Sequence, residues 1–160
     1  MDPLLSRASH RGRRPRIAYR RIVVPLVDGA ESETAVSLAA ELASDHGASI
    51  TAVVVIELPA ELPLQAHMPE EEAQARRVLE EARAIAAAYD VRVRARVLRA
   101  RQPGEAIVAE AEALQADLVV LRAATKQRAE GRAPLFGKTV DYILKHASCR
   151  VLVAAPARRR

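Results

Sequence analysis

Apolar and polar positions alternate along this chain in blocks that predict strands and helices in turn. Apolar runs at residues 21–27, 49–58, 117–121 and 149–155 predict strands, and the first two are continuous enough to be covered on both faces. Residues 91–100 instead alternate at period two, with valine or alanine on one side and arginine on the other. That pattern predicts an edge strand with one wet face.

The segments between these strands carry apolar residues at helical spacing. Helices are predicted over 34–45, from Pro69 onward, and over 102–116 and 138–146. Ser32 is the predicted N-cap of the first helix, because its hydroxyl suits that position. Strict alternation of strand and helix favours one parallel sheet with helices on both faces, joined by right-handed crossovers.

The amino-acid composition indicates which residues form the core and where the charges lie along the chain. The chain has 160 residues, half of them apolar, with only three Tyr, one Phe and no Trp, so its core must be aliphatic. The net charge of +5 gathers at the ends, where arginines dominate, and the chain between them is close to neutral. We expect a basic, flexible arm over residues 1–19, one domain over 20–156 and a basic tail over 157–160.

The composition also indicates the cellular compartment and the kinds of partner to expect. The one cysteine, Cys149, excludes an internal disulfide framework and favours a reducing, cytoplasmic compartment. Its apolar neighbours predict a small core residue rather than a reactive thiol. No apolar run approaches the roughly 20 residues of a membrane span. The few aromatic side chains form no recognisable platform on which bases could stack, so nucleic acid is not an expected partner.

No catalytic or metal site is predicted. The histidines lie on separate segments without metal-ligand spacing. The Gly-Lys-Thr at 137–139 ends like a P-loop, but the first glycine of that motif would fall on Arg132, and no strand leads directly into it.

With this order in place, residues 20–155 resemble the universal stress protein family. The most specific stretch is GKTVDYILKHASCRVLVAAP (137–156), which is similar to the family's closing glycine, helix and final strand. The resemblance implies an adenine nucleotide alpha hydrolase-like fold, with a doubly wound five-stranded parallel sheet in the order 3-2-1-4-5. It also implies a homodimer through the strand Cys149–Ala155, and ATP at the ends of the first and fourth strands.

The family's ATP signature, G-x2-G-x9-G-[ST], is only partly present. Gly137 matches its third glycine, Lys138 stands where Ser or Thr is usual, and Thr139 comes one place late. The other two glycines fall on non-glycine residues, whether counted back from Gly137 or forward from the strand. Those residues are Gln127 and Ala124 in one register, and Arg122 and Thr125 in the other.

The first strand departs from the family as well. The family has Pro-x-Asp there, whereas Asp28 follows Pro25 one place later. A one-residue slip turns a strand side chain to the other face unless a bulge restores it. Basic side chains stand where the glycines are missing, and they could hold phosphates. The expected binding residues are therefore Pro25, Val27, Asp28, Val55, Arg122, Lys126, Arg128, Gly137, Lys138 and Thr139.

The sequence thus favours a regulatory or binding module with weak nucleotide or anion binding, for which ATP or another adenine nucleotide is the candidate ligand. Three alternatives stay open. One is a homodimeric protein-interaction module without nucleotide. Another is an adenine-nucleotide enzyme, such as a weak ATPase. The third is a sensor of a cyclic dinucleotide or adenine nucleotide that serves a transporter or other protein partner.

Overall fold

Strands and helices alternate along the chain, as predicted. The computed structural model describes residues 17–26, 31–123 and 137–155. The strands are β1 (Arg21–Leu26), β2 (Ser49–Glu57), β3 (Val93–Ala100), β4 (Leu118–Arg122) and β5 (Arg150–Ala154). The helices are α1 (Glu31–His46), α2 (Pro69–Ala87), α3 (Pro103–Ala113) and α4 (Lys138–His146).

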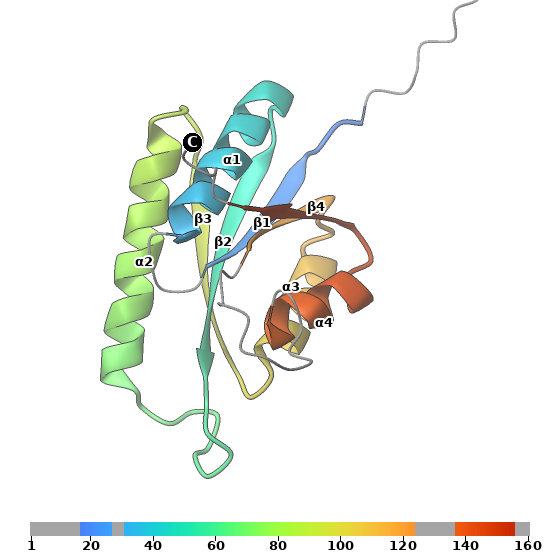
Figure 1. The fold of residues 1–160 in the computed structure, drawn as a ribbon. Coiled ribbons are helices and arrows are strands. Elements are labelled where there is room, and N and C mark those ends of the chain that lie inside the picture. The colour runs from blue at the N-terminus through green and yellow to red at the C-terminus, as the bar shows by residue number, and fades with distance from the viewer. Residues whose placement is uncertain (1–16, 27–30, 124–136, 156–160) are drawn as a thin grey trace, which may run out of the picture.

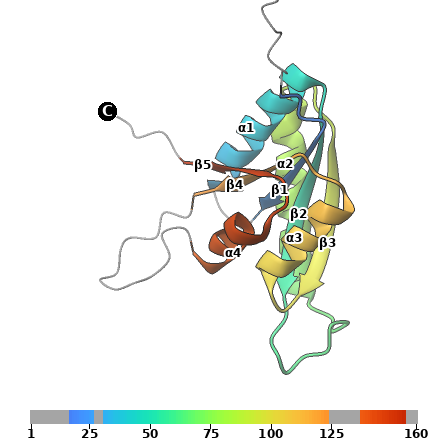
Figure 2. The same ribbon diagram turned by 90° about the vertical axis from the view of Figure 1, so that its right-hand side faces the viewer.

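The strands form one parallel sheet in the order β3-β2-β1-β4-β5. Their labels run in this order from right to left in Figure 2. The predicted order 3-2-1-4-5 is confirmed. β1 occupies the centre, and β3 and β5 form the two edges.

Both faces of the sheet are buried at its central strands β1, β2 and β4. Ile22, Val24 and Leu26 belong to a core shared with α1 and α2, whereas Val23 belongs to a second core shared with α3 and α4. Figure 1 shows α3 and α4 together at the lower right, away from α2 at the left. Burying one such side chain contributes about 1.5–3 kcal/mol. Since neighbouring residues of β1 enter opposite cores, its sequence has to be continuously apolar.

Two boundary predictions are wrong. Ser32 is not an N-cap, because α1 begins at Glu31 and the buried Ser32 lies inside its first turn. Ser32 falls on the same helical stripe as the buried Ala35 and Val36, which draws it toward the core. Arg122 ends β4 instead of opening the following loop, because it continues the pairing with Ala154 of β5.

The start of α2 agrees with its sequence. Pro69 is the first helical residue, where a missing amide hydrogen costs nothing. Residues 70–72 are glutamates, which oppose the positive end of the helix dipole. Desolvation disfavours the Glu72 carboxylate, but the Met68 amide, His67 and Arg99 outweigh it and hold the pKa of Glu72 below its ordinary value.

The predicted alternation of β3 is wrong at its end. Arg99 lies on the side of the valines, where Nη1 donates to the carbonyl of Ala66 at 2.6 Å and Nη2 donates to Glu72. Leu98 takes the opposite side and packs against the core beneath α3. Apolar burial of Leu98 on one face and ionic contact of Arg99 on the other reverse the pattern.

The connection between β2 and α2 is tied to the end of β3. Arg101 donates to the carbonyls of Pro59 and Leu62, at 2.7 and 3.0 Å. Together with Arg99, it satisfies carbonyl groups of a segment that has no regular secondary structure. These bonds hold the connection against the carboxyl end of the sheet.

Asp117 fastens the start of β4 to the start of β1. Its Oδ2 accepts hydrogen bonds from the backbone N–H groups of Arg20 and Arg21, at 2.9 and 2.8 Å. Its own N–H donates to the carbonyl of Arg21 at 2.8 Å. The hydrogen bonds from Arg20 and Arg21 hold the pKa of Asp117 below its ordinary value.

Replacing Asp117 with Asn should lower the free energy of unfolding by about 1 kcal/mol at neutral pH, since a neutral amide oxygen is the weaker acceptor. Folding lowers the carboxyl's pKa, so its contribution is present above the unfolded pKa of about 4 and is lost as pH falls through the lowered value. Urea unfolding curves of the two proteins should therefore converge at acid pH. A difference that stays constant down to about pH 2 would contradict this role.

Gly104 lies where α3 meets α4. A Cβ placed on Gly104 would lie 2.9 Å from the Cβ of Tyr142 and 3.0 Å from its Cδ1. The Tyr142 Cβ is fixed to the backbone of α4, so the clash could be relieved only by moving a helix. The Tyr142 ring also stacks on His146, with centroids 3.9 Å apart.

Gly104→Ala should destabilise the protein by about 1–3 kcal/mol, because it overpacks this contact. The direction of the change in the free energy of unfolding is informative, since Gly→Ala inside a helix ordinarily stabilises a protein by about 0.5–1 kcal/mol. Urea unfolding gives the difference directly. A variant that is more stable than the wild type would mean that α3 and α4 have room to accept a methyl group.

Candidate functional site

The sheet has one point at which its strand order reverses. From β1 the chain proceeds to β2 and β3 on one side, and β4 and β5 fill the other side. In open α/β sheets, ligands bind outside the carboxyl ends of the strands at such a point. Here that location is the edge where Leu26 ends β1 and Arg122 ends β4.

Pairing between β1 and β4 stops before that edge. β1 pairs with β2 along its whole length, but with β4 only at Ile22 and Val23. Pro25 lies two residues beyond Val23, and it has no amide hydrogen with which to continue a ladder. The two central strands thus cease to pair before reaching Leu26 and Arg122.

The predicted binding residues are partly described. Pro25 is buried in β1, and Val55 of β2 packs against the core beneath α3. Arg122 ends β4, whereas Gly137, Lys138 and Thr139 form the start of α4. The remaining four residues lie outside the described residues: Val27, Asp28, Lys126 and Arg128.

The start of α4 has the features of an anion-binding helix terminus. Gly137 is its N-cap, with φ 83° and ψ 165°, a conformation essentially restricted to glycine. No side chain among the described residues caps this end, and the first helical bond runs from the N–H of Asp141 to the carbonyl of Gly137 at 3.0 Å. The N–H groups of residues 138–140 therefore have no helical acceptor. Such groups, with the positive end of the helix dipole, attract anions.

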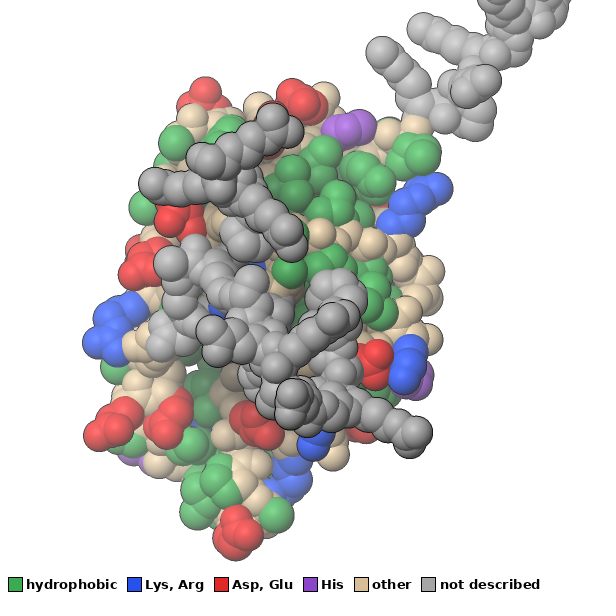
Figure 3. Space-filling view, viewed as in Figure 1, with side chains coloured by type: hydrophobic (Ala, Val, Ile, Leu, Met, Phe, Trp, Pro, Cys, Tyr) green, Lys and Arg blue, Asp and Glu red, His purple; other side chains and the backbone are tan. Residues whose placement is uncertain are grey.

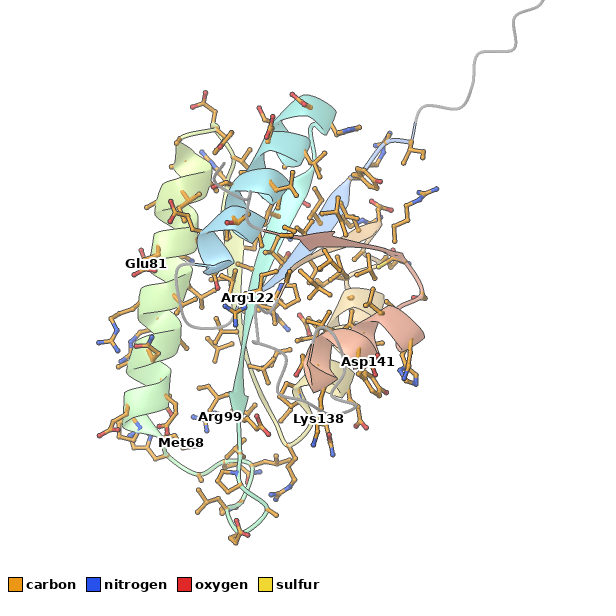
Figure 4. All side chains as sticks on the ribbon, in the orientation of Figure 1. Met68, Glu81, Arg99, Arg122, Lys138 and Asp141 are labelled. Atoms are coloured by element: carbon orange, nitrogen blue, oxygen red, sulfur yellow. The ribbon has the colours of Figure 1, made fainter. Side chains whose placement is uncertain are left out.

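Two cationic side chains lie at this end of the sheet, where the exposed Glu57 also ends β2. Arg122 is half-buried at the end of β4, and Lys138 is exposed at the start of α4; Figure 4 labels both. Asp141 lies in the first turn of α4, but its carboxylate forms an ion pair with Lys145 at 3.0 Å. The uncapped amides of α4 and the exposed Lys138 can attract a phosphate at this helix terminus.

The opposite end of the sheet, where the strands begin, carries a shallow depression in the surface. The depression has a volume of about 480 Å³ and is lined by Ala18, Ala116, Asp117, Ser148, Cys149 and Arg150. Burial raises the pKa of the Cys149 thiol, which disfavours the reactive thiolate. None of the predicted binding residues lines this depression.

Within residues 17–26, 31–123 and 137–155, no group of three or more His, Cys, Asp or Glu side chains is arranged to hold a metal ion. No helix in these ranges is long and apolar enough to span a membrane.

Sequence reasoning missed the early end of pairing between β1 and β4. The signal was present, since proline inside a central strand removes a ladder donor. It also missed Asp117 as the link between the starts of these strands. Recognising that link required knowing that β1 and β4 are neighbours.

These features define a doubly wound α/β domain with a candidate anion site at its switch point. The chain belongs to the universal stress protein family, whose model matches residues 18–155. The match extends from just before β1 to just after β5.

Solved structures of the family have the same fold. A universal stress protein from Archaeoglobus fulgidus is 20% identical with a TM-score of 0.71, covering 85% of this chain and 98% of that one. The Archaeoglobus fulgidus universal stress protein in complex with dAMP is 19% identical, with a TM-score of 0.69. That match covers 86% of this chain and 99% of the other. A universal stress protein family protein from Arabidopsis thaliana with AMP bound is 16% identical, with a TM-score of 0.61. That match covers 86% of this chain and 92% of the Arabidopsis chain. No curated protein sequence matched the chain.

Proposed function

We propose that this chain is a regulatory module that binds an adenine nucleotide weakly at the carboxyl ends of β1 and β4. The observation that carries the proposal is the coincidence of three features at the switch point. The two central strands stop pairing there, Arg122 ends β4, and α4 begins with uncapped amides behind Gly137 and Lys138. Family proteins that hold dAMP and AMP support an adenine nucleotide as the ligand.

We expect weak binding because the sequence departs from the family's ATP-binding pattern at several positions. Glycines let the backbone approach a phosphate closely, and two signature glycines are absent in either register. Asp28 follows Pro25 one place later than the family pattern. Side-chain cations then have to replace amide donors. An exposed cation such as Lys138 gives only modest attraction, because water and salt screen it.

Calorimetric titration with ATP and Mg²⁺ should give a dissociation constant weaker than about 1 μM, which corresponds to roughly −8 kcal/mol. Lys138→Ala should weaken binding by about two- to fivefold, as expected for one screened charge. Arg76→Ala is the control, since it removes one exposed positive charge from the outer face of α2 and leaves the ion pair of Asp141 with Lys145 intact, so affinity should be unchanged.

Two outcomes would contradict the proposal. Affinity tighter than about 1 μM would mean that the cations fully replace the glycine cradle. Absence of binding to ATP, AMP and dAMP alike would favour the protein-interaction module without nucleotide. Inclusion of a cyclic dinucleotide in the same series tests the sensor alternative.

We propose that the protein is a homodimer through the strand Cys149–Ala155. β5 is an edge strand that pairs with β4 alone, and Val151, Leu152 and Val153 are only half-buried in the single chain. Figure 3 shows apolar side chains gathered at the upper right, the region that β5 crosses in Figure 1. An apolar open edge is a template for pairing, and two antiparallel copies would close it with two-fold symmetry.

Changing Val151 or Val153 to Lys should convert dimers into monomers, because the new charge would be buried at a self-pairing edge. Light scattering at several protein concentrations measures the mass. Salt should have little effect on the wild-type dimer, since apolar packing holds it. A wild type that is already monomeric at high concentration, or lysine variants that remain dimers, would exclude this interface.

The cellular setting is part of the same proposal. We infer a cytoplasmic location, supported by the single cysteine, which allows no disulfide within the chain, in an α/β domain of this family. The physiological role would then be to report nucleotide state to a protein partner, through a site and an edge that lie on different parts of the sheet.

A further inference from the structure

The second edge of the sheet, β3, has free hydrogen-bonding capacity. β3 pairs with β2 alone, and Figure 2 shows it on the far side of the sheet from β5. Among the described residues, the backbone outside β2 contributes one contact, from the N–H of Leu58 to the carbonyl of Ala100 at its very end. An edge strand presents a row of unpaired N–H and C=O groups.

The two sides of this edge differ in chemistry. Arg94 and Arg96 face the side of α3, and the exposed Arg92 precedes them at the same period. Val97 lies on the side of α2 and is 45% exposed, although it belongs to a strand. A strand laid beside β3 would therefore meet cations on one face and an apolar side chain on the other.

One of these arginines already has a carboxylate beside it. Nε of Arg96 lies 2.9 Å from Oε1 of Glu110, whose side chain is 11% exposed on α3. The contact is ionic without hydrogen-bond geometry, because that oxygen accepts no hydrogen bond within the described part of the chain. Arg92 and Arg94 have no such partner among the described residues. The row thus has unused capacity for carboxylates.

We propose that β3 binds an extended acidic segment of a partner protein, which adds as a sixth strand. Every second residue of the segment would be Asp or Glu facing the arginines, and the residues between them would be apolar and lie beside Val97. A strand repeats every two residues at roughly 6.6 Å, so the charges of both strands stay in step. Backbone bonds would give affinity, and the alternating side chains would give specificity.

Charge selects this occupant over two others. A second copy of β3 would set arginines opposite arginines, which is unfavourable across strands. A nucleic acid could neutralise Arg92 and Arg94, but it would leave the open backbone groups and Val97 without a partner. A strand with alternating acidic and apolar residues would pair with the open backbone groups, the arginines and Val97 together.

The test measures fluorescence anisotropy of a labelled peptide of alternating Glu and Val, added to the full chain. The wild type should bind it, and Arg92→Glu with Arg94→Glu should weaken binding by at least about tenfold, through repulsion across the strands. The same variant should instead bind a peptide of alternating Lys and Val. Arg76→Glu with Arg77→Glu makes the same charge change on the outer face of α2 and should leave binding unchanged.

A second peptide separates strand addition from simple charge attraction. Its sequence is the same, but its alternate amides are methylated, so that it keeps its carboxylates and loses its hydrogen bonds. The proposal expects this peptide to bind at least about tenfold more weakly. Equal binding of the methylated peptide would overturn strand addition, and so would equal binding of a single-stranded oligothymidine. Failure of the charge-reversed variant to accept the lysine peptide would overturn the role of the arginine row.

Discussion

The burial of both faces of the central strands is the constraint on which the rest of this structure depends. A parallel sheet needs helices on each side, and β1 supplies both cores at once through Ile22 and Val23. This central position forces the chain to fill the sheet outward in two directions. The switch point between β1 and β4 is therefore a consequence of burial and topology together. It places Arg122 and the start of α4 at the carboxyl end without any dedicated scaffold.

Much of the fold could be predicted because burial leaves a strong record in the sequence. The apolar runs gave the strands, and their alternation with helices gave the parallel sheet. Ser32 and Arg99 were misassigned because their positions depend on tertiary contacts, with the core in one case and with Glu72 in the other. Local patterns do not encode such contacts.

The candidate site was less accessible to sequence reasoning. Gly137 and Lys138 were found through family resemblance, and Gly137 does adopt a conformation that needs glycine. The early end of pairing beyond Val23 was missed, because the effect of Pro25 depends on which strand lies beside it. Val27, Asp28, Lys126 and Arg128 lie outside the described residues, so their place at the site stays a prediction.

The two edges show how one fold can present unlike surfaces. β5 has an apolar edge, which suits an identical copy, whereas β3 has an arginine row, which repels its own copy. Both edges lie on a sheet whose centre holds the candidate nucleotide site.

The proposed adenine-nucleotide site lies at the carboxyl ends of β1 and β4. Backbone amide NMR during titration with ATP and Mg²⁺ tests it most directly, because each residue reports separately. Binding at this site should shift the amide signals of Leu26, Arg122 and Gly137 to Val140, and leave those of Asp117 and Ser148 at the opposite end unchanged. Shifts confined to Asp117 and Ser148, or no shifts at saturating nucleotide, would contradict it.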